Sequence, residues 1–139
     1  LARAFMQSGV LAYPTWWVET SCLTCAEAQA AGCRIVTTDL AALTETVADR
    51  GILIPWGRHE TDTNTMPTAE YREKFIEALV HELKREPQDQ EQESIKEYAR
   101  LHFDIESLAD EWDELLKLLV QEMSINVVNR FHDAEAAAQ

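Results

Sequence analysis

The sequence lacks a long apolar run. No segment approaches the ~20 consecutive apolar residues that a membrane-spanning helix needs. No charged-then-apolar leader is visible either, so the sequence predicts neither a transmembrane helix nor a secretory signal. We therefore expect a cytoplasmic protein. Because the first residue is Leu1 rather than Met, we also expect a piece cut from a longer protein.

Basic residues are scarce. Lys and Arg total 12 against 25 Asp and Glu, which gives a formal net charge of -13. Such a surface repels phosphate backbones, so we expect no nucleic-acid partner. Bulk charge also disfavours docking on anionic lipid, although a local basic patch leaves peripheral membrane contact open.

Cysteine and histidine are also few. Three cysteines (Cys22, Cys25 and Cys33) form no closed disulfide framework, and they fit a reducing compartment. The four histidines are scattered without a pair at helix-face spacing, so no metal site is expected. With 139 residues and 46% apolar residues, the chain suits one domain with a buried core.

The first part of the chain alternates short apolar runs with helical pattern. A helix end at 1–8 is followed by strands at 10–14, 34–38 and 51–55, with helices at 22–31 and 41–48 between them. Asp39 is a candidate N-cap for the second of these helices. This order predicts an α/β fold: a Rossmann-like parallel sheet with right-handed crossovers and flanking helices.

The second part is highly charged and helical. After a loop at 56–68, helices are expected at 69–85 and 88–103, and Asp104 is a plausible N-cap for a long helix from Ile105. The first carries an apolar face of Phe75, Ile76, Leu79, Val80 and Leu83. The expected organisation is a domain over 1–104, a closing helix over 105–128 and a tail over 129–139 that frays.

Two carboxylates flank the predicted junction between the first strand and its helix. Glu19 falls in the loop, and Glu27 falls about two turns into the helix. Eight helical steps rise roughly 12 Å, which is the upper limit for their separation. A helix N-terminus between them receives phosphate, and carboxylates accept hydrogen bonds from vicinal hydroxyls. A nucleotide sugar, with hydroxyls at both ends and a diphosphate between, fits this arrangement at the usual ligand edge of α/β folds.

A resemblance to a known family rests on three segments in order. They are the E-x7-E spacing of Glu19 and Glu27, then E-A-Q-A-A-G-C-R-I-V-T-T-D, then A-L-T-E-T-V-A-D-R-G-I-L-I. Together they closely resemble the C-terminal donor-binding domain of the retaining GT-B-type glycosyltransferases (glycosyl transferases group 1). The piece F-D-I-E-S-L-A-D-E-W-D-E-L-L resembles that family's closing helix, so the likeness covers roughly 1–119.

The resemblance implies roles for individual residues. Glu19 would contact hydroxyls of the transferred sugar and is the catalytic candidate. Ser21, Cys22 and Leu23 would present backbone N–H groups to the sugar and diphosphate, and Glu27 would hold the ribose hydroxyls. Glu45 matches a further family Glu and is expected to be structural.

The sequence departs from the family pattern at a few positions. Ser21 stands where Phe is frequent and Cys22 where Gly is frequent, and 39–42 lacks the usual Gly pair. The family needs no bound metal or other cofactor beyond its nucleotide-sugar substrate. Its acceptor site lies in an N-terminal domain, which is the expected intramolecular partner. We therefore expect the 139-residue chain alone to be inactive.

Plainer interpretations exist for the same residues. Thr24 and Glu27 match a capping box, and Glu19 suits a surface acid near a helix start. Cys22 and Cys25 have the C-x-x-C spacing of a thioredoxin-like redox motif. Trp16 and Trp17 fit packing better than a sugar site, and the acid-rich 86–97 fits a solvated helix face.

Two other function classes therefore stay open. The apolar stripe from Ile105 to Met123 can pack on the missing domain or dimerise as a short coiled coil, which would suit a non-enzymatic interaction module. A thiol-redox protein is the third hypothesis.

Overall fold

The computed structural model describes residues 1–57 and 66–137, with side chains described through residue 123. It divides into two compact units, Leu1–His102 and Phe103–Gln139. Each unit is described by itself. Most of the expected loop at 56–68, including Asp62 and Asn64, lies outside the described residues.

The first unit contains three strands and five helices among its described residues. The strands are β1 (Val10–Tyr13), β2 (Arg34–Asp39) and β3 (Gly51–Pro55). The helices are α1 (Ala2–Met6), α2 (Leu23–Ala30), α3 (Ala42–Val47), α4 (Ala69–Lys84) and α5 (Asp89–Phe103), the last ending at the unit boundary. These positions agree closely with the elements expected from the sequence.

The three strands form one parallel sheet in the order β1-β2-β3. Val10 lies opposite Arg34 at the first register position of β1 and β2, and Ile35 lies opposite Gly51 at that of β2 and β3. The predicted α/β class, with a small parallel sheet flanked by helices and followed by a long C-terminal helix, is therefore confirmed.

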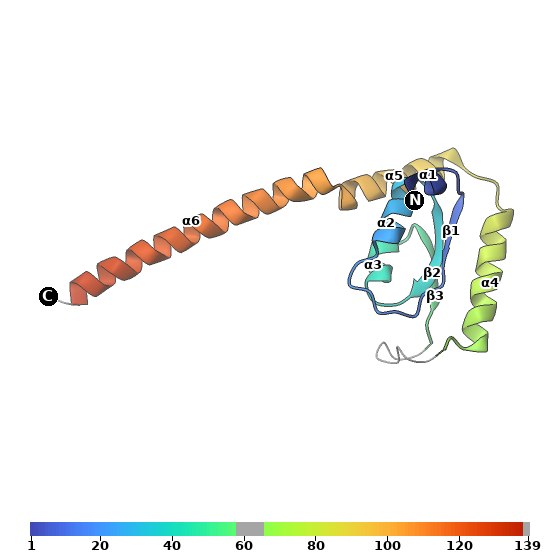
Figure 1. Ribbon diagram of the computed structural model, residues 1–139, viewed down its shortest axis with the longest axis horizontal. Coiled ribbons are helices and arrows are strands. Elements are labelled where there is room, and N and C mark those ends of the chain that lie inside the picture. Colours follow the sequence, from blue (N-terminus) through green and yellow to red (C-terminus); the bar gives the residue numbers. More distant parts are fainter. Residues whose placement is uncertain (58–65, 138–139) are drawn as a thin grey trace. The chain divides into compact units, whose positions relative to one another are not determined.

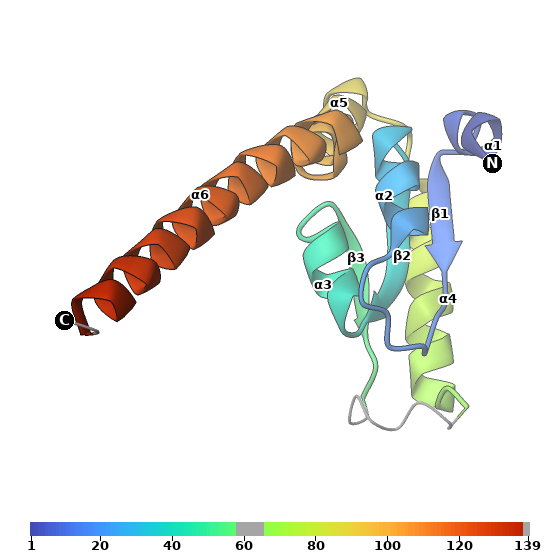
Figure 2. The same cartoon turned by 60° about the vertical axis from the view of Figure 1, so that its left-hand side comes forward.

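Two apolar cores lie on opposite faces of the sheet, because successive strand residues point to opposite sides. On one face Ile35 packs with Phe5 of α1, Cys25 of α2 and Leu43 of α3. On the other face Val36 packs with residues of α4. Figures 1 and 2 show this layering, with α2 and α3 on one side of the strands and α4 on the other. The sheet is thus held between two helical layers.

The buried face of α4 agrees with the expected one only in part, because Phe75 is buried and Leu79 packs against the core as predicted. Tyr71, Phe75 and Glu82 are buried, whereas Ile76 and Leu83 of the predicted apolar face are exposed. Tyr71 packs edge-on against Trp56, with ring centroids 5.3 Å apart. Glu82 is paired with Arg34 of β2 and with Arg85 at the end of α4, and a periodicity argument does not detect the first of these contacts.

Positive-φ backbone occurs in the short connections of the first unit, at Gly32, Ala41 and Ala48. Gly32, with φ +83°, closes α2 as expected from its place after the helix. Ala41 precedes α3 with φ 51° and ψ -135°, a region that favours glycine. Ala41 is therefore the N-cap residue, and the predicted N-cap role of Asp39 is wrong. Asp39 instead accepts a 2.8 Å hydrogen bond from the Thr44 hydroxyl.

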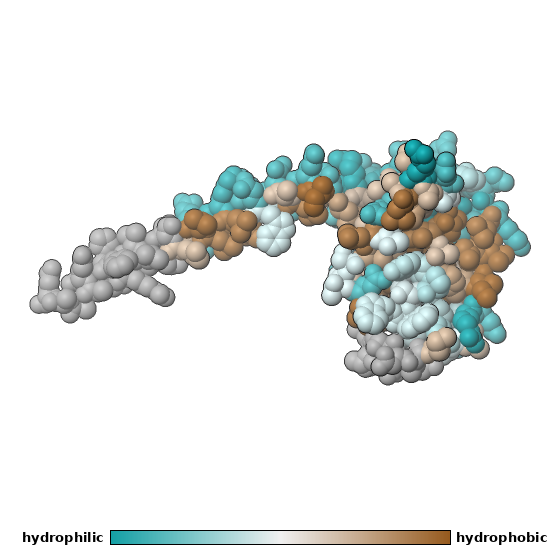
Figure 3. Space-filling model, in the orientation of Figure 1, coloured by the Kyte–Doolittle hydropathy of each residue, from teal (hydrophilic) through white to brown (hydrophobic). Residues whose placement is uncertain are grey.

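The second unit is helix α6 (Ile105–Ala137), 33 residues long. Its helical backbone continues past residue 128, where the sequence suggested an end. Ser107 Oγ donates a 2.9 Å hydrogen bond to Asp104 Oδ2 just before the helix. Its apolar residues are exposed, and Figure 3 shows them along one side of the helix with polar residues along the other. Within the described part of the chain, no helix is long and apolar enough to cross a membrane.

Candidate functional site

The candidate site lies where β1 ends and the chain turns toward α2. Glu19 is half-buried in this connection, and the Tyr13 hydroxyl donates a 2.6 Å hydrogen bond to its Oε1. This bond is the main cause that raises the pKa of Tyr13 above its ordinary value. The backbone carbonyl of Glu19 also accepts a 3.3 Å hydrogen bond from the Ala42 N–H. Glu19 is thus held at both its side chain and its backbone.

Buried threonines of β2 fix the start of the same connection. The Thr37 hydroxyl donates a 2.8 Å hydrogen bond to the carbonyl of Tyr13. The Thr38 hydroxyl donates to the carbonyl of Thr15 and lies 2.6 Å from the Tyr71 hydroxyl. Burial is the main cause that raises the pKa of Tyr71. These contacts anchor the chain that carries Glu19. In the sequence, the two threonines at the end of the predicted strand were the one indication of them.

Cys22 and Cys25 form a buried thiol pair beside Glu19. They are 1% and 0% exposed. A hydrogen bond from the Cys25 thiol is the main cause that lowers the pKa of Cys22, and the same bond raises the pKa of Cys25. The lowered pKa suits the redox hypothesis, whereas the burial of both sulfurs restricts access to them. A redox role stays a hypothesis.

Helix α2 starts directly after Cys22, and Cys25 lies in its first turn. Its N-cap residue is Cys22, so the first helical residue is Leu23. The capping box of Thr24 and Glu27 is therefore wrong, because Thr24 already lies inside the helix. Ser21 and Leu23 have exposed side chains, and Cys22 is buried. The structure thus brings Glu19 and these three residues together on one connection.

Glu27 occupies a different surface. It lines a pocket of about 550 Å³ with Ala30, Ala31, Lys96 and three residues at the N-terminus (Leu1, Ala2 and Met6). That pocket contains none of the other predicted donor-binding residues. The expectation that Glu19 and Glu27 hold two ends of one ligand stays a prediction.

Two further pockets lie beside the β1–α2 connection. One, of about 370 Å³, is lined by Tyr13, Pro14, Thr15, Trp16 and Trp17. The other, of about 270 Å³, is bounded by Trp16, Pro14 and apolar residues that include Tyr71 and Phe75 of α4. Trp17 is 68% exposed, so it is not a core residue. Its exposed indole is a surface on which a sugar ring can stack or another domain can pack, so of the packing roles that the sequence favoured only the core one is excluded.

The remaining candidate residues are structural or unclustered. The backbone carbonyl of Glu45 accepts a 3.1 Å hydrogen bond from the Tyr98 hydroxyl, which ties α3 to α5, while the structural role expected of the exposed Glu45 side chain stays a prediction. In the part of the chain that the structure describes, no group of three or more His, Cys, Asp or Glu residues is placed to hold a metal ion.

Sequence reasoning missed the role of Tyr13. The only available signal was a tyrosine at the end of the strand, six residues before Glu19. Comparison with protein-family models, with curated proteins and with solved structures gave no match.

Proposed function

We propose that this chain is the donor-binding part of a retaining GT-B-type glycosyltransferase, which transfers a sugar from a nucleoside-diphosphate sugar. The observation that carries the proposal is Glu19, fixed by Tyr13 2.6 Å away, beside the start of α2. This position is the carboxyl end of a parallel sheet, where α/β folds place their ligands. The family resemblance of 1–119 supplies the reaction class.

Each residue of the connection has a task in this proposal. The backbone N–H groups of Ser21, Cys22 and Leu23, at the positive end of α2, bind the diphosphate. The Glu19 carboxylate accepts hydrogen bonds from hydroxyls of the transferred sugar. Trp17 contributes an aromatic face for the sugar ring.

Glu27 is proposed to hold the ribose hydroxyls. It is exposed on α2 and lines the pocket that contains Lys96. If the ribose lies along α2 toward that pocket, the ammonium of Lys96 attracts the negatively charged nucleotide. The carboxylate of Glu27 and this ammonium then define the nucleotide end of the site.

The acceptor site is proposed to lie in a further domain of the same protein. The residues described here include the proposed donor contacts and no second domain of comparable fold. We therefore expect the 139-residue chain to bind a donor nucleotide without turning it over. Turnover of a nucleotide sugar by this chain alone would contradict that part of the proposal.

Nucleotide binding tests the proposal directly. UDP, GDP and ADP are titrated calorimetrically into the chain and into Glu27→Gln, with Glu106→Gln on α6 as the matched acid-to-amide control. At least one nucleotide should bind, and Glu27→Gln should weaken it by about 1–3 kcal/mol because the negative charge and one of the two acceptor oxygens are lost. Wild-type affinity in Glu27→Gln would remove Glu27 from the site, and no binding by any nucleotide would contradict the proposed function.

A second candidate function is a protein-interaction module. The observation that favours it is the exposed stripe of α6, in which Leu108, Leu115 and Leu119 are 36%, 47% and 46% exposed. Contiguous exposed apolar surface marks interaction sites. If this is the main function, Leu115→Asn with Leu119→Asn abolishes partner binding or self-association, measured by light scattering, while nucleotide binding is absent in the wild type.

A further inference from the structure

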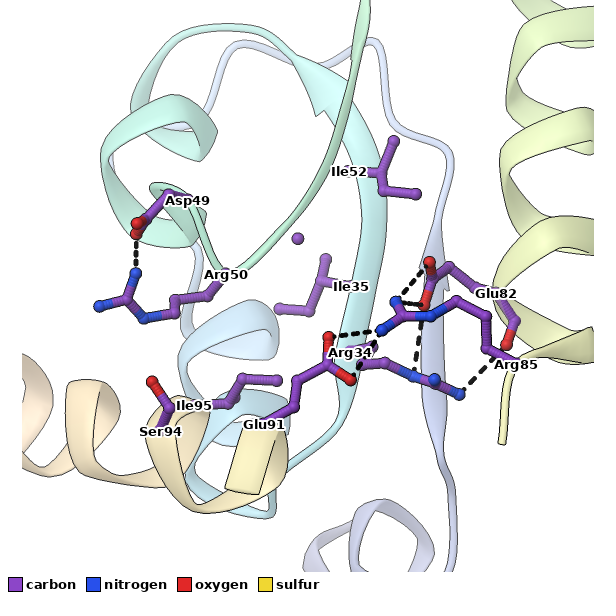
Figure 4. Close-up of a pocket in the computed structure, with 11 residues that line it drawn as sticks. Arg34, Ile35, Asp49, Arg50, Ile52, Glu82, Arg85, Glu91, Ser94 and Ile95 are labelled. Atoms are coloured by element: carbon purple, nitrogen blue, oxygen red, sulfur yellow. Dashed lines mark hydrogen bonds and ion pairs between the residues drawn. The ribbon is translucent and has the colours of Figure 1, made fainter. Parts of the chain in front are cut away.

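We propose that the cavity at the amino ends of β2 and β3 binds a small oxyanion, either a phosphate or a carboxylate. The cavity has a volume of about 290 Å³. Figure 4 shows its lining from β2, β3, the end of α4 and the start of α5. Six of the lining residues carry the argument: Arg34, Arg50, Glu82, Arg85, Glu91 and Ser94.

Arg34 is the central residue of this cavity. Its side chain is only 8% exposed, and its Nε lies 3.3 Å from Glu82 Oε2. Its Nη2 donates a 3.1 Å hydrogen bond to the backbone carbonyl of Glu82. Its Nη1 is buried and has no hydrogen-bond partner. A buried charged donor without an acceptor is costly, so this atom requires a further acceptor.

The carboxylates that line the cavity are already occupied. Arg85 Nη1 donates to both oxygens of Glu82, at 2.8 and 2.9 Å. Arg85 Nη2 donates to both oxygens of Glu91, at 2.9 and 3.0 Å. Figure 4 shows these side chains beside Arg34, joined by dashed lines. The acceptor that Arg34 Nη1 needs must therefore come from outside this network.

Arg50 also lines the cavity and carries another buried donor without a partner, and Figure 4 shows its side chain directed toward Asp49 rather than toward Arg34. Arg50 Nε is buried without a hydrogen-bond partner, whereas its Nη1 pairs with Asp49. Its guanidinium lies 5.1 Å from the centroid of the Tyr98 ring, which holds it against α5. Within the described residues, buried side-chain polar atoms without a partner number three, and two of them belong to these arginines.

This donor surplus selects the class of ligand. A ligand that only accepts hydrogen bonds satisfies guanidinium N–H groups, and carboxylates and phosphates are the acceptors that arginine matches best. Asp49 is 83% exposed, so solvent screens its charge from the cavity. A cation or a hydrogen-bond donor would leave Arg34 Nη1 unsatisfied.

The cavity is independent of the proposed donor site. It lies at the amino ends of the strands, where Arg34 begins β2 and Gly51 begins β3. Glu19 follows the carboxyl end of β1. Oxyanion binding in this cavity can therefore be tested independently of nucleotide binding at the proposed donor site.

Titration followed by backbone and arginine side-chain NMR tests the proposal. Sodium phosphate and sodium acetate are added in separate arms at constant ionic strength, with sodium chloride as the reference. Saturable shifts at the amides of Gly51 and Ser94 and at the Arg34 side chain are expected in at least one arm. The arm that saturates at lower concentration identifies phosphate or carboxylate as the preferred ligand. Shifts that do not saturate, or that equal those in chloride, contradict the proposal.

Two pairs of variants locate the binding. Arg34→Lys keeps the charge beside Glu82 but removes Nη1, and it should weaken the oxyanion about tenfold or more. Arg3→Lys on exposed α1 is the control and should bind as the wild type does.

The second pair avoids any loss of folding, because Ser94 is exposed at the cavity rim. Ser94→Glu should weaken binding by charge repulsion, whereas Ser94→Gln, of nearly the same shape, should not. Equal affinity in Ser94→Glu and Ser94→Gln would place the ion elsewhere.

Discussion

The Tyr13 hydroxyl donates a hydrogen bond of 2.6 Å to Glu19 Oε1, joining the last residue of β1 to the loop that precedes α2. Thr37 holds the carbonyl of the same tyrosine from β2. The carboxylate is therefore positioned by the sheet itself, and a ligand at this edge meets an acceptor that is already ordered.

Tyr13→Phe tests this positioning role. The substitution keeps the ring but removes the bond to Glu19, so the carboxylate loses its fixed orientation. We expect the affinity for a nucleotide sugar to fall by about tenfold, the value of one hydrogen bond to a charged group. Affinity for the bare nucleotide should not change. Calorimetric titration of both ligands measures the difference, and an equal loss for both would indicate general unfolding of the loop.

Ala41→Gly should stabilise the protein. Ala41 has φ 51° and ψ -135°, a conformation that costs an L-residue of order 1–3 kcal/mol. Glycine relieves this strain at some cost in chain entropy, so we expect a gain of about 1 kcal/mol in the free energy of unfolding. Ala42→Gly, inside α3, should instead destabilise. Urea denaturation compares the two, and destabilisation by Ala41→Gly would contradict the strain argument.

Glu82→Gln should destabilise the protein strongly. Glu82 is 3% exposed and faces both Arg34 and Arg85, so its removal leaves buried guanidinium charge uncompensated. Breaking a buried pair in this way costs about 3–5 kcal/mol.

A surface pair on the same helix provides the control. Glu70→Gln removes an exposed 2.7 Å ion pair with Lys74 and should have little effect on urea denaturation. Similar effects of the two substitutions would show that the buried network contributes nothing special to stability.

Alkaline pH should destabilise the fold in two stages. Folding raises the pKa of Cys25, through its hydrogen bond to Cys22, and that of Cys33, through burial. The unfolded chain then loses these thiol protons from about pH 8.5, while the native state keeps them. Bound protons in the native state exceed those in the unfolded state, so stability falls as pH rises.

The tyrosines extend this effect above about pH 10, the ordinary tyrosine pKa. Tyr13 and Tyr71 both have raised pKa values in the folded state. The lowered pKa of Cys22 acts in the opposite direction and offsets part of the first stage. The free energy of unfolding, measured from pH 7 to 11, should therefore decline most steeply above pH 10, and Tyr13→Phe should flatten that decline. A constant free energy over this range would contradict these shifts.

The sequence predicted the elements well where local pattern determines them. The β-branched run at 34–38 and the alanine-rich run before Gly32 have lengths and boundaries that need no distant partner. The N-terminus of α2 was harder, because its N-cap is Cys22, a residue without the strong capping preference of Ser, Thr, Asp or Asn. Thr24 with Glu27 therefore offered a capping box as a plainer alternative, which the structure excludes.

Contacts between distant residues were not predictable in this way. Glu82 pairs with Arg34, which lies 48 residues earlier in the chain. The periodicity of α4 alone does not predict that pairing. Glu91 was expected on a solvated face, yet its carboxylate pairs with Arg85 at the oxyanion cavity. For the proposed donor site, the sequence located Glu19 and the start of α2, whereas the support from Tyr13 and Thr37 required the register of the sheet.

Glu19 is proposed to recognise the transferred sugar. The decisive measurement is the ratio of the affinities for a nucleotide sugar and for its nucleotide diphosphate, in the wild type and in Glu19→Gln. The wild type should prefer the sugar nucleotide, and Glu19→Gln should lose that preference, by about 1–3 kcal/mol, while it binds the diphosphate normally. An unchanged ratio in Glu19→Gln would contradict the account.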